Sequence, residues 1–224
     1  MSQTVSLTAK DGHKLDAYVA TPAGKPKGGL VVIQEIFGAN HHIRNVADRF
    51  AAMGYATVAP ALFDRVQRGV DLGYDPESVA KGRALREKVS MDGSLADVQA
   101  AIEYIKQFGK VGVVGYCWGG SLAFLAATRL NGATASVGYY GGMIAGHANE
   151  KPKIPLILHF GDKDQSIPMS DVEKVKQARP EVPIYVYSAG HGFACDERGA
   201  FDKTAHEQAL QRTTAFFKQH ISAD

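Results

Sequence analysis

The sequence predicts an α/β fold in which a mostly parallel sheet of about eight strands carries helices on both faces. Three observations support this prediction. Strand-length apolar runs alternate with apolar stripes at helical spacing, residues 29–34 form the continuous run of a strand buried on both faces, and a second such run ends in a Gly-x-Cys-x-Gly turn before an apolar helix. Because 45% of its 224 residues are hydrophobic, the chain can bury one large core, and we expect one domain over residues 1–224.

The first half begins with a predicted hairpin. Two short runs, residues 4–9 and 14–20, flank an Asp-Gly pair, which is typical of a tight turn between antiparallel strands. The strand at residues 29–34 follows, and apolar residues then recur at helical spacing until Gly54 ends the helix. Residues 55–59 form the next predicted strand.

The second half continues the alternation. An apolar stripe over residues 95–105 predicts a helix, and residues 111–114 predict the strand that leads into the cysteine turn. Further predicted strands lie at residues 133–139, 154–160 and 182–187. The last predicted helix spans about residues 204–220, with an inward face of Ala205, Ala209, Leu210, Thr213, Phe216 and Phe217. In such a fold, ligands bind at the carboxyl ends of the parallel strands.

The cysteine turn is the most informative segment. Gly115-Tyr116-Cys117-Trp118-Gly119-Gly120 joins the strand to a helix-forming run and has the pattern of the nucleophile elbow of an α/β-hydrolase, with Cys where Ser is usual. The glycines permit a turn too tight for a Cβ atom, and the nucleophile lies at its apex. Backbone N–H groups of the following helix can stabilise developing negative charge. The alternative is a glycine-rich turn with an inert cysteine.

Candidate partners of Cys117 follow later strands. Two carboxylates, Asp162 and Asp164, come before His191, which gives the nucleophile–acid–base order of α/β-hydrolases. An imidazole can take the thiol proton, and it needs an acceptor on its other nitrogen to fix its tautomer. We favour Asp164 as this acceptor because it follows the turn directly, with Asp162 as the competitor.

The composition excludes several classes of partner. With 25 basic and 23 acidic side chains, the net charge of +2 is too balanced to favour nucleic acid or an anionic membrane. The N-terminal segment lacks the apolar core of a secretory signal, and no apolar run is long enough to span a bilayer. We therefore expect a cytoplasmic protein, a monomer or weak homodimer, that acts on a small molecule.

The cysteines and histidines predict neither a disulfide nor a metal site. A bridge between the two cysteines, Cys117 and Cys195, would consume the proposed nucleophile. His41 and His42 have no cysteine, carboxylate or histidine at ligand spacing, so we expect them at the start of a helix, without a metal. His159 is expected to be a partly buried strand residue. No cofactor is expected.

Several segments together resemble the dienelactone hydrolase family of the α/β-hydrolase superfamily, over nearly the whole chain. They are Gln34-Glu35-Ile36-Phe37-Gly38, the cysteine turn, Gly138-Tyr139-Tyr140-Gly141, Gly161-x-x-Asp164-x-x-Ile167-Pro168 and Gly190-His191-Gly192-Phe193. The resemblance implies a catalytic triad of Cys117, Asp164 and His191. It also implies an oxyanion hole formed by the backbone N–H groups of Ile36 and Trp118. Glu35 is implied to contact the resting thiol and to release it when substrate arrives; a structural salt bridge is the alternative for this carboxylate.

The resemblance leaves the substrate pocket open, with Phe37, Tyr140, Cys195 and Arg83 as candidate pocket residues. In family members that cleave dienelactones, an arginine four residues after the catalytic histidine helps to bind the substrate carboxylate, and Cys195 occupies that position here. Arg83 and Arg86 lie near a second family arginine on a predicted helix, whose solvated face is the alternative role for them. We therefore expect weak preference for acidic lactones, unless Arg83, Arg86 or Arg198 supplies the charge.

The predicted function is hydrolysis of a small lactone or carboxylic ester through a thioester acyl-enzyme. A thioesterase or a general carboxylesterase would share the same residues. A glutamine amidotransferase is disfavoured because its acid follows the histidine closely, whereas Asp164 precedes His191. A non-catalytic binding protein is the remote alternative, since it would not need the nucleophile, acid and base together.

Overall fold

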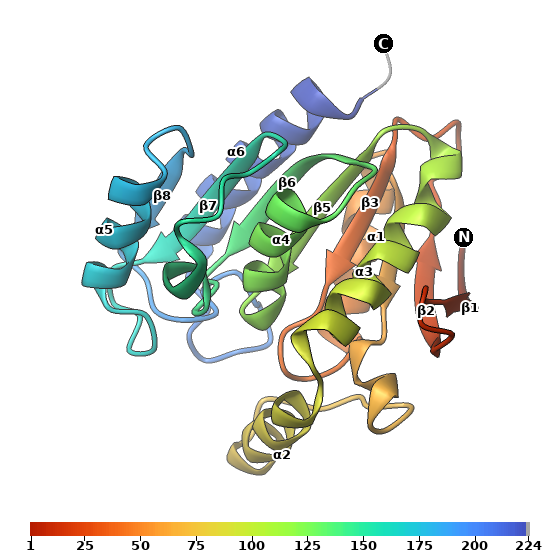
Figure 1. The fold of residues 1–224 in the computed structure, drawn as a ribbon, viewed down its shortest axis with the longest axis horizontal. Coiled ribbons are helices and arrows are strands. Elements are labelled where there is room, and N and C mark those ends of the chain that lie inside the picture. Colours follow the sequence, from red (N-terminus) through yellow and green to blue (C-terminus); the bar gives the residue numbers. More distant parts are fainter. Residues whose placement is uncertain (223–224) are drawn as a thin grey trace.

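The centre of the protein is an eight-stranded sheet (Figure 1), described here by a computed structural model that covers residues 1–222. Its strands are β1 (Ser2–Thr8), β2 (Lys14–Ala20), β3 (Gly29–Ile33), β4 (Ala56–Pro60), β5 (Val111–Tyr116), β6 (Ala133–Tyr139), β7 (Leu156–Gly161) and β8 (Ile184–Tyr187). They lie in the order β1-β2-β4-β3-β5-β6-β7-β8. The β1–β2 and β2–β4 pairs are antiparallel and the other pairs are parallel, which confirms the predicted mostly parallel sheet.

Helices cover both faces of this sheet. They are α1 (His41–Ala52), α2 (Pro76–Lys88), α3 (Met91–Ile105), α4 (Trp118–Arg129), α5 (Met169–Ala178) and α6 (Lys203–His220), with short 3-10 helices η1 (Leu62–Arg65), η2 (Lys106–Phe108) and η3 (Ile144–His147). The helices α3 and α4 pack on one face, whereas α1 and α6 pack on the other (Figure 1). None of the helices within residues 1–222 combines the length and apolar character needed to cross a bilayer.

The burial of the strands explains their composition. Every residue of β3, β4, β5 and β7 is buried, and apart from His159 in β7 their sequences are apolar or small-residue runs, as expected for parallel strands covered on both faces. The edge strand β1 is mostly exposed and carries polar side chains. Removing apolar surface from water stabilises the fold by about 25 cal/mol per Å². The central strands therefore form a rigid base for the loops at their ends.

Side-chain caps define where four of the helices begin. Asn40, Asp75, Ser90 and Asp202 each accept a hydrogen bond from the backbone N–H three residues later, at the starts of α1, α2, α3 and α6. The helix α4 is different, because its N-cap residue is Cys117, which makes no side-chain cap hydrogen bond. The first N–H groups of α4 are therefore left for another partner.

The predicted elements match the structure closely, with local differences. Residues 14–20 and 133–139 have the bounds of β2 and β6, and the other predicted strands differ by one or two residues at their ends. The helix α3 begins four residues before the apolar stripe, because Ser90 caps it there. The helix α5 was not predicted, since only Val172 and Val175 are buried on it.

Two predictions about buried side chains need correction. On the last helix, Leu210 and Phe216 lie only half-buried at the margin of the core, because the face toward the sheet centres on the smaller Ala209 and Thr213. His159 is fully buried in β7 rather than partly buried, and its two ring nitrogens are hydrogen-bonded to other buried side chains.

The predicted site segments lie at the carboxyl edge of the parallel strands. The loops after β3, β5, β7 and β8 all start at this edge, and α2 lies beyond it (Figure 1). Gly82 brings α2 close to the loop after β3, since a Cβ atom at this position would lie 2.1 Å from the carbonyl oxygen of Ile36. The structure therefore places α2 beside the loop that follows β3.

We expect Gly115→Ala to destabilise the protein strongly. An added Cβ atom would lie 1.9 Å from the backbone oxygen of Gly119, so the elbow would have to open. A loss of more than about 3 kcal/mol in the free energy of unfolding is expected, measured by urea denaturation. The matched control is Gly199→Ala, where an added Cβ atom meets no atom within 4 Å. Equal stability of the two variants would contradict this account of the elbow.

Candidate active site

The cysteine turn forms a strained elbow between β5 and α4. Cys117 has φ 54° and ψ −117°, a conformation that L-residues rarely adopt. Its backbone N–H donates to the carbonyl oxygen of Tyr139 (3.0 Å), and the N–H of Gly119 donates to that of Gln34 (3.1 Å). A Cβ atom on Gly119 would lie 2.5 Å from the carbonyl oxygens of Gln34 and Ile33. Glycine at this position thus allows the elbow to pack against the end of β3.

Three side chains form a continuous hydrogen-bonded row at the carboxyl edge. The Nε2 atom of His191 lies 3.1 Å from Sγ of Cys117, and its Nδ1 atom lies 2.7 Å from Oδ2 of Asp164. The other carboxylate oxygen of Asp164 accepts the backbone N–H groups of Ser166 (2.7 Å) and Ile167 (3.1 Å). These two bonds hold the carboxylate in a fixed orientation toward the imidazole.

The two competing carboxylates occupy different surroundings. Asp164 is buried and contacts the imidazole of His191, whereas Asp162 is exposed. The geometry therefore favours Asp164 as the imidazole partner, in agreement with the preference from sequence.

The environment of His191 favours its protonated form. Burial alone disfavours the imidazolium, but the hydrogen bonds to Asp164 and Cys117, together with the charges of these groups, outweigh burial and raise the pKa of His191 to about 10. An imidazolium next to the sulfur stabilises a thiolate, which is the nucleophilic form of cysteine. The row therefore places a charged hydrogen-bond donor beside the sulfur.

Two backbone N–H groups beside Cys117 are available for an anion. Ile36 and Trp118 both line the cavity that contains the sulfur, and neither N–H donates to another group among residues 1–222. Trp118 is the first residue of α4, where the helix dipole adds positive potential. The arrangement suits an oxyanion that develops at a carbonyl attacked by the sulfur.

Glu35 has a different partner from the one that the family resemblance implies. Its Oε1 atom accepts a hydrogen bond from Nη1 of Arg198 at 2.9 Å, and the carboxylate is 1% exposed. In the part of the chain that the structure describes, the sulfur of Cys117 is hydrogen-bonded to His191 and not to Glu35. Within the described residues, Glu35 therefore makes no hydrogen bond to the thiol, because its buried carboxylate binds Arg198 instead.

The cavity at Cys117 has a volume of about 320 Å³ and a positive lining. Arg83 and Arg86 reach it from α2, and Arg198 reaches it from the loop after β8. No acidic side chain lies among the residues of positions 1–222 that line it. The remaining lining is largely apolar and consists of Ile36, Phe37, Val79, Trp118, Met143 and Ile167, with Ser121, Gly142 and Ser166 between them.

The structure divides the candidate pocket residues into two groups. Phe37 and Arg83 line the cavity as predicted, whereas Tyr140 and Cys195 are fully buried and are not part of the lining. The expectation of weak selectivity for acidic lactones rested on the loss of an arginine at position 195. Arg83, Arg86 and Arg198, the side chains that could replace this charge, all line the cavity.

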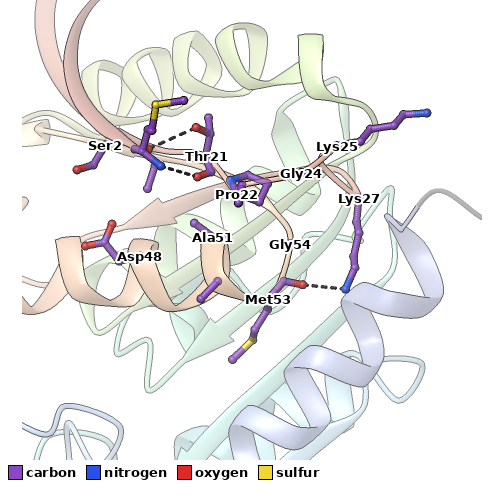
Figure 2. A pocket seen from close by; sticks show the side chains of 14 residues that line it. Ser2, Thr21, Pro22, Gly24, Lys25, Lys27, Asp48, Ala51, Met53 and Gly54 are labelled. Atoms are coloured by element: carbon purple, nitrogen blue, oxygen red, sulfur yellow. Dashed lines mark hydrogen bonds between the residues drawn. The ribbon is translucent and has the colours of Figure 1, made fainter.

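A larger hollow elsewhere lacks this chemistry. It has a volume of about 700 Å³ and lies between the start of β1 and the end of α1 (Figure 2). Lys27 and Gly54, which line it, precede β3 and β4, so it lies toward the amino ends of these strands. The Lys27 ammonium donates to the carbonyl oxygen of Met53. Although this hollow is larger, it contains no nucleophile with a base beside it among its described lining residues.

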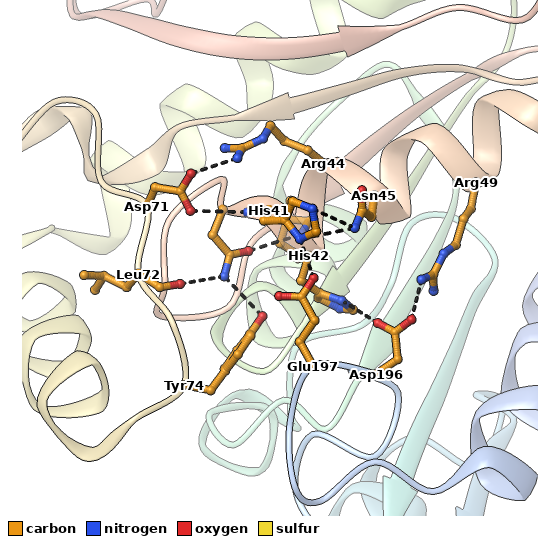
Figure 3. Close-up of polar contacts among 12 residues, drawn as sticks. His41, His42, Arg44, Asn45, Arg49, Asp71, Leu72, Tyr74, Asp196 and Glu197 are labelled. Atoms are coloured by element: carbon orange, nitrogen blue, oxygen red, sulfur yellow. Dashed lines mark hydrogen bonds and ion pairs between the residues drawn. The ribbon is translucent and has the colours of Figure 1, made fainter.

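Polar contacts to α1 hold the loop that follows β8 (Figure 3). The imidazole of His42 lies 3.2 Å from Oδ1 of Asp196, which also pairs with Arg49, and His41 lies 2.6 Å from Oε1 of Glu197. His41 and His42 begin a helix, as predicted, but the sequence gave no sign of these partners. They fix the loop that delivers Arg198 to the cavity.

Comparisons with known proteins identify the family of this chain. Residues 15–221 match the model of the dienelactone hydrolase family. The chain is 32% identical to a carboxymethylenebutenolidase of Pseudomonas putida, over 96% of each chain, and 31% identical to carboxymethylenebutenolidase 1 of Cupriavidus pinatubonensis, over 95% of each. A solved structure from Klebsiella pneumoniae superposes with a TM-score of 0.85 at 27% identity, covering 98% of this chain and 99% of the other. The chain therefore belongs to the dienelactone hydrolase family.

Proposed function

We propose that this protein hydrolyses a small, carboxylate-bearing lactone or ester, with Cys117 as nucleophile, His191 as acid and base, and Asp164 as the group that orients the imidazole. Family membership and the carboxymethylenebutenolidase relatives make the chain a hydrolase of ester or lactone bonds. The hydrogen-bonded row from carboxylate to imidazole to sulfur is the observation that carries the assignment of roles.

The geometry supports a two-step reaction. The Cys117 thiolate attacks the carbonyl carbon, and the N–H groups of Ile36 and Trp118 bind the oxyanion, each contributing about 3 kcal/mol. The tetrahedral intermediate collapses to a thioester as the C–O bond breaks, and His191 gives its proton to the leaving oxygen. Water then attacks the thioester while His191 takes its proton, which releases the carboxylic acid and the sulfur.

The three cavity arginines support an anionic substrate. Arg198 is paired with Glu35, so Arg83 and Arg86 are the side chains with more freedom to bind a carboxylate. A charge-assisted hydrogen bond typically contributes about 1.5–3 kcal/mol, or roughly a factor of 10 to 100 in affinity. A lactone that carries a carboxylate, of the kind named in the two relatives, fits a cavity of this size and charge.

Replacing Cys117 with Ala should leave a folded protein with almost no hydrolase activity, because no sulfur remains to form the acyl-enzyme. Activity would be measured on carboxymethylenebutenolide, an aryl ester and an acyl thioester, and folding by circular dichroism. Cys117→Ser should also be severely impaired, since an alcohol needs stronger base assistance than a thiol. Retained turnover in Cys117→Ala would exclude covalent catalysis at this residue.

Exchanging Asp164 for Asn should lower kcat strongly, by a factor of about 10² or more, because the neutral amide no longer stabilises the imidazolium. Asp162→Asn is the matched control, being an exposed carboxylate on the same loop, and should retain most of the activity. Steady-state kinetics of both variants would give the two kcat values to compare. A larger loss in Asp162→Asn, with the fold intact, would overturn the assignment of the acid.

Removal of the α2 arginines should weaken the binding of a negatively charged substrate more than that of a neutral one. We expect Arg83→Met and Arg86→Met together to raise KM for carboxymethylenebutenolide about tenfold or more, with little change for its neutral methyl ester. Lys81→Met, an exposed change on the same helix, is the control. If both substrates lost the same factor, or neither lost any, the arginines would not recognise the carboxylate.

A further inference from the structure

Three potential metal ligands from distant parts of the chain meet beside the catalytic cavity. Glu35 follows β3, His42 lies in the first turn of α1, and Cys195 lies in the loop after β8. Their ligand atoms lie within 4.8 Å of one another, and each residue is at most 1% exposed. The sequence prediction of no metal site rested on spacing along the chain, and the fold brings together residues that this spacing separates.

The imidazole of His42 is prepared as a ligand. Its Nδ1 atom lies 3.2 Å from Oδ1 of Asp196, a carboxylate that can only accept, so Nδ1 donates this hydrogen bond (Figure 3). In the neutral imidazole with this tautomer, Nε2 is the atom that carries the lone pair. Asp196 is itself held by Arg49. The Nε2 atom is buried and has no hydrogen-bond partner within residues 1–222. A carboxylate on the far nitrogen is the usual outer support of a metal-binding histidine.

The carboxylate of Glu35 is also incompletely satisfied. Arg198 binds its Oε1 atom, whereas Oε2 is buried without a hydrogen-bond partner in the described part of the chain. A buried polar atom without a partner costs about 1–3 kcal/mol. Two such atoms, one on Glu35 and one on His42, in a cluster with the thiol of Cys195, indicate that this place is built to hold a further group.

We propose that Glu35, His42 and Cys195 bind a divalent transition metal, with Zn²⁺ as the best fit. Thiolate sulfur, imidazole nitrogen and carboxylate oxygen are the three ligand types that Zn²⁺ takes, usually with tetrahedral geometry, whereas Mg²⁺ and Ca²⁺ prefer oxygen alone. Tetrahedral ligands at zinc distances lie about 3.3–3.6 Å apart, so small side-chain movements convert the cluster into a site. Water would supply the fourth ligand.

Binding would change the proton content and the charge of the cluster. On binding, the S–H bond breaks, the S–metal bond forms and the proton passes to solvent. The ion then faces the thiolate and the carboxylate, and the Arg198 guanidinium paired with Glu35 leaves one net positive charge at the cluster. Because Glu35 also holds Arg198, the metal would weaken that ion pair and connect the cluster to the catalytic cavity.

The test uses metal-free Cys117→Ala protein, which lacks the rival thiol of the catalytic row. Titration with Co²⁺ should show one saturable equivalent and a thiolate-to-cobalt charge-transfer band, and Zn²⁺ should displace the cobalt. In the same background, His42→Gln should weaken Zn²⁺ binding at least tenfold, and Cys195→Ser should remove the charge-transfer band. His147→Gln is the matched control, since His147 is half-buried in η3 and lies outside the cluster.

Absence of saturable binding to the Cys117→Ala protein would overturn the proposal. So would unchanged affinity and an unchanged band in both cluster variants. If either variant fails to fold by circular dichroism, Asp196→Asn replaces it, with an expected loss of 10- to 100-fold in affinity through the outer support of His42; an unchanged affinity there would also overturn the site. Because binding is measured in a chain without the nucleophile, the result is independent of the proposed hydrolysis.

Discussion

The close backbone contact between the elbow and its neighbouring strands is the constraint on which the site depends. Gly119 donates to Gln34 at the end of β3, and a Cβ atom on Gly120 would lie 2.1 Å from the carbonyl oxygen of Tyr139. These contacts hold Cys117 at a positive φ and bring the Trp118 N–H into the same cavity as the Ile36 N–H. The packing around the elbow maintains the strained backbone of Cys117, and a residue larger than glycine at position 119 or 120 would prevent that packing. The central strands, which are buried throughout, give this packing a rigid base.

The electrostatics of the site follow from a few buried pairs. Asp164 and the sulfur of Cys117 keep a proton on His191, while Glu35 is opposed by Arg198. Each buried charge therefore has an opposite charge in contact with it, as low-dielectric surroundings require. The arginines of α2 add positive charge to the cavity lining, which contains no acidic side chain among residues 1–222. That excess favours an anionic ligand over a neutral one of the same shape.

The sequence predicted the sheet and the contacts within the row of Cys117, His191 and Asp164 better than it predicted the surroundings of the row. Cys117, Asp164 and His191 follow separate strands, and the fold class alone brings such strand ends together. Contacts such as Arg198–Glu35 and His42–Asp196 join residues 163 and 154 positions apart, and no local pattern marks them. The position of Cys195 shows the same limit. Alignment with the family placed it in the pocket, whereas the loop geometry buries it behind the lining.

The loop after β8 connects the two chemical features of this edge. It carries His191, and Gly192 has a φ of 81°, where an added Cβ atom would lie 2.6 Å from the Arg198 guanidinium. Glycine at this turn therefore lets Arg198 fold back toward Glu35 while Cys195 lies against His42. One short segment thus supplies His191, a cavity arginine and the cysteine of the interior cluster. Any group that binds Glu35 would change its ion pair with Arg198, and this would change the positive charge near a bound substrate.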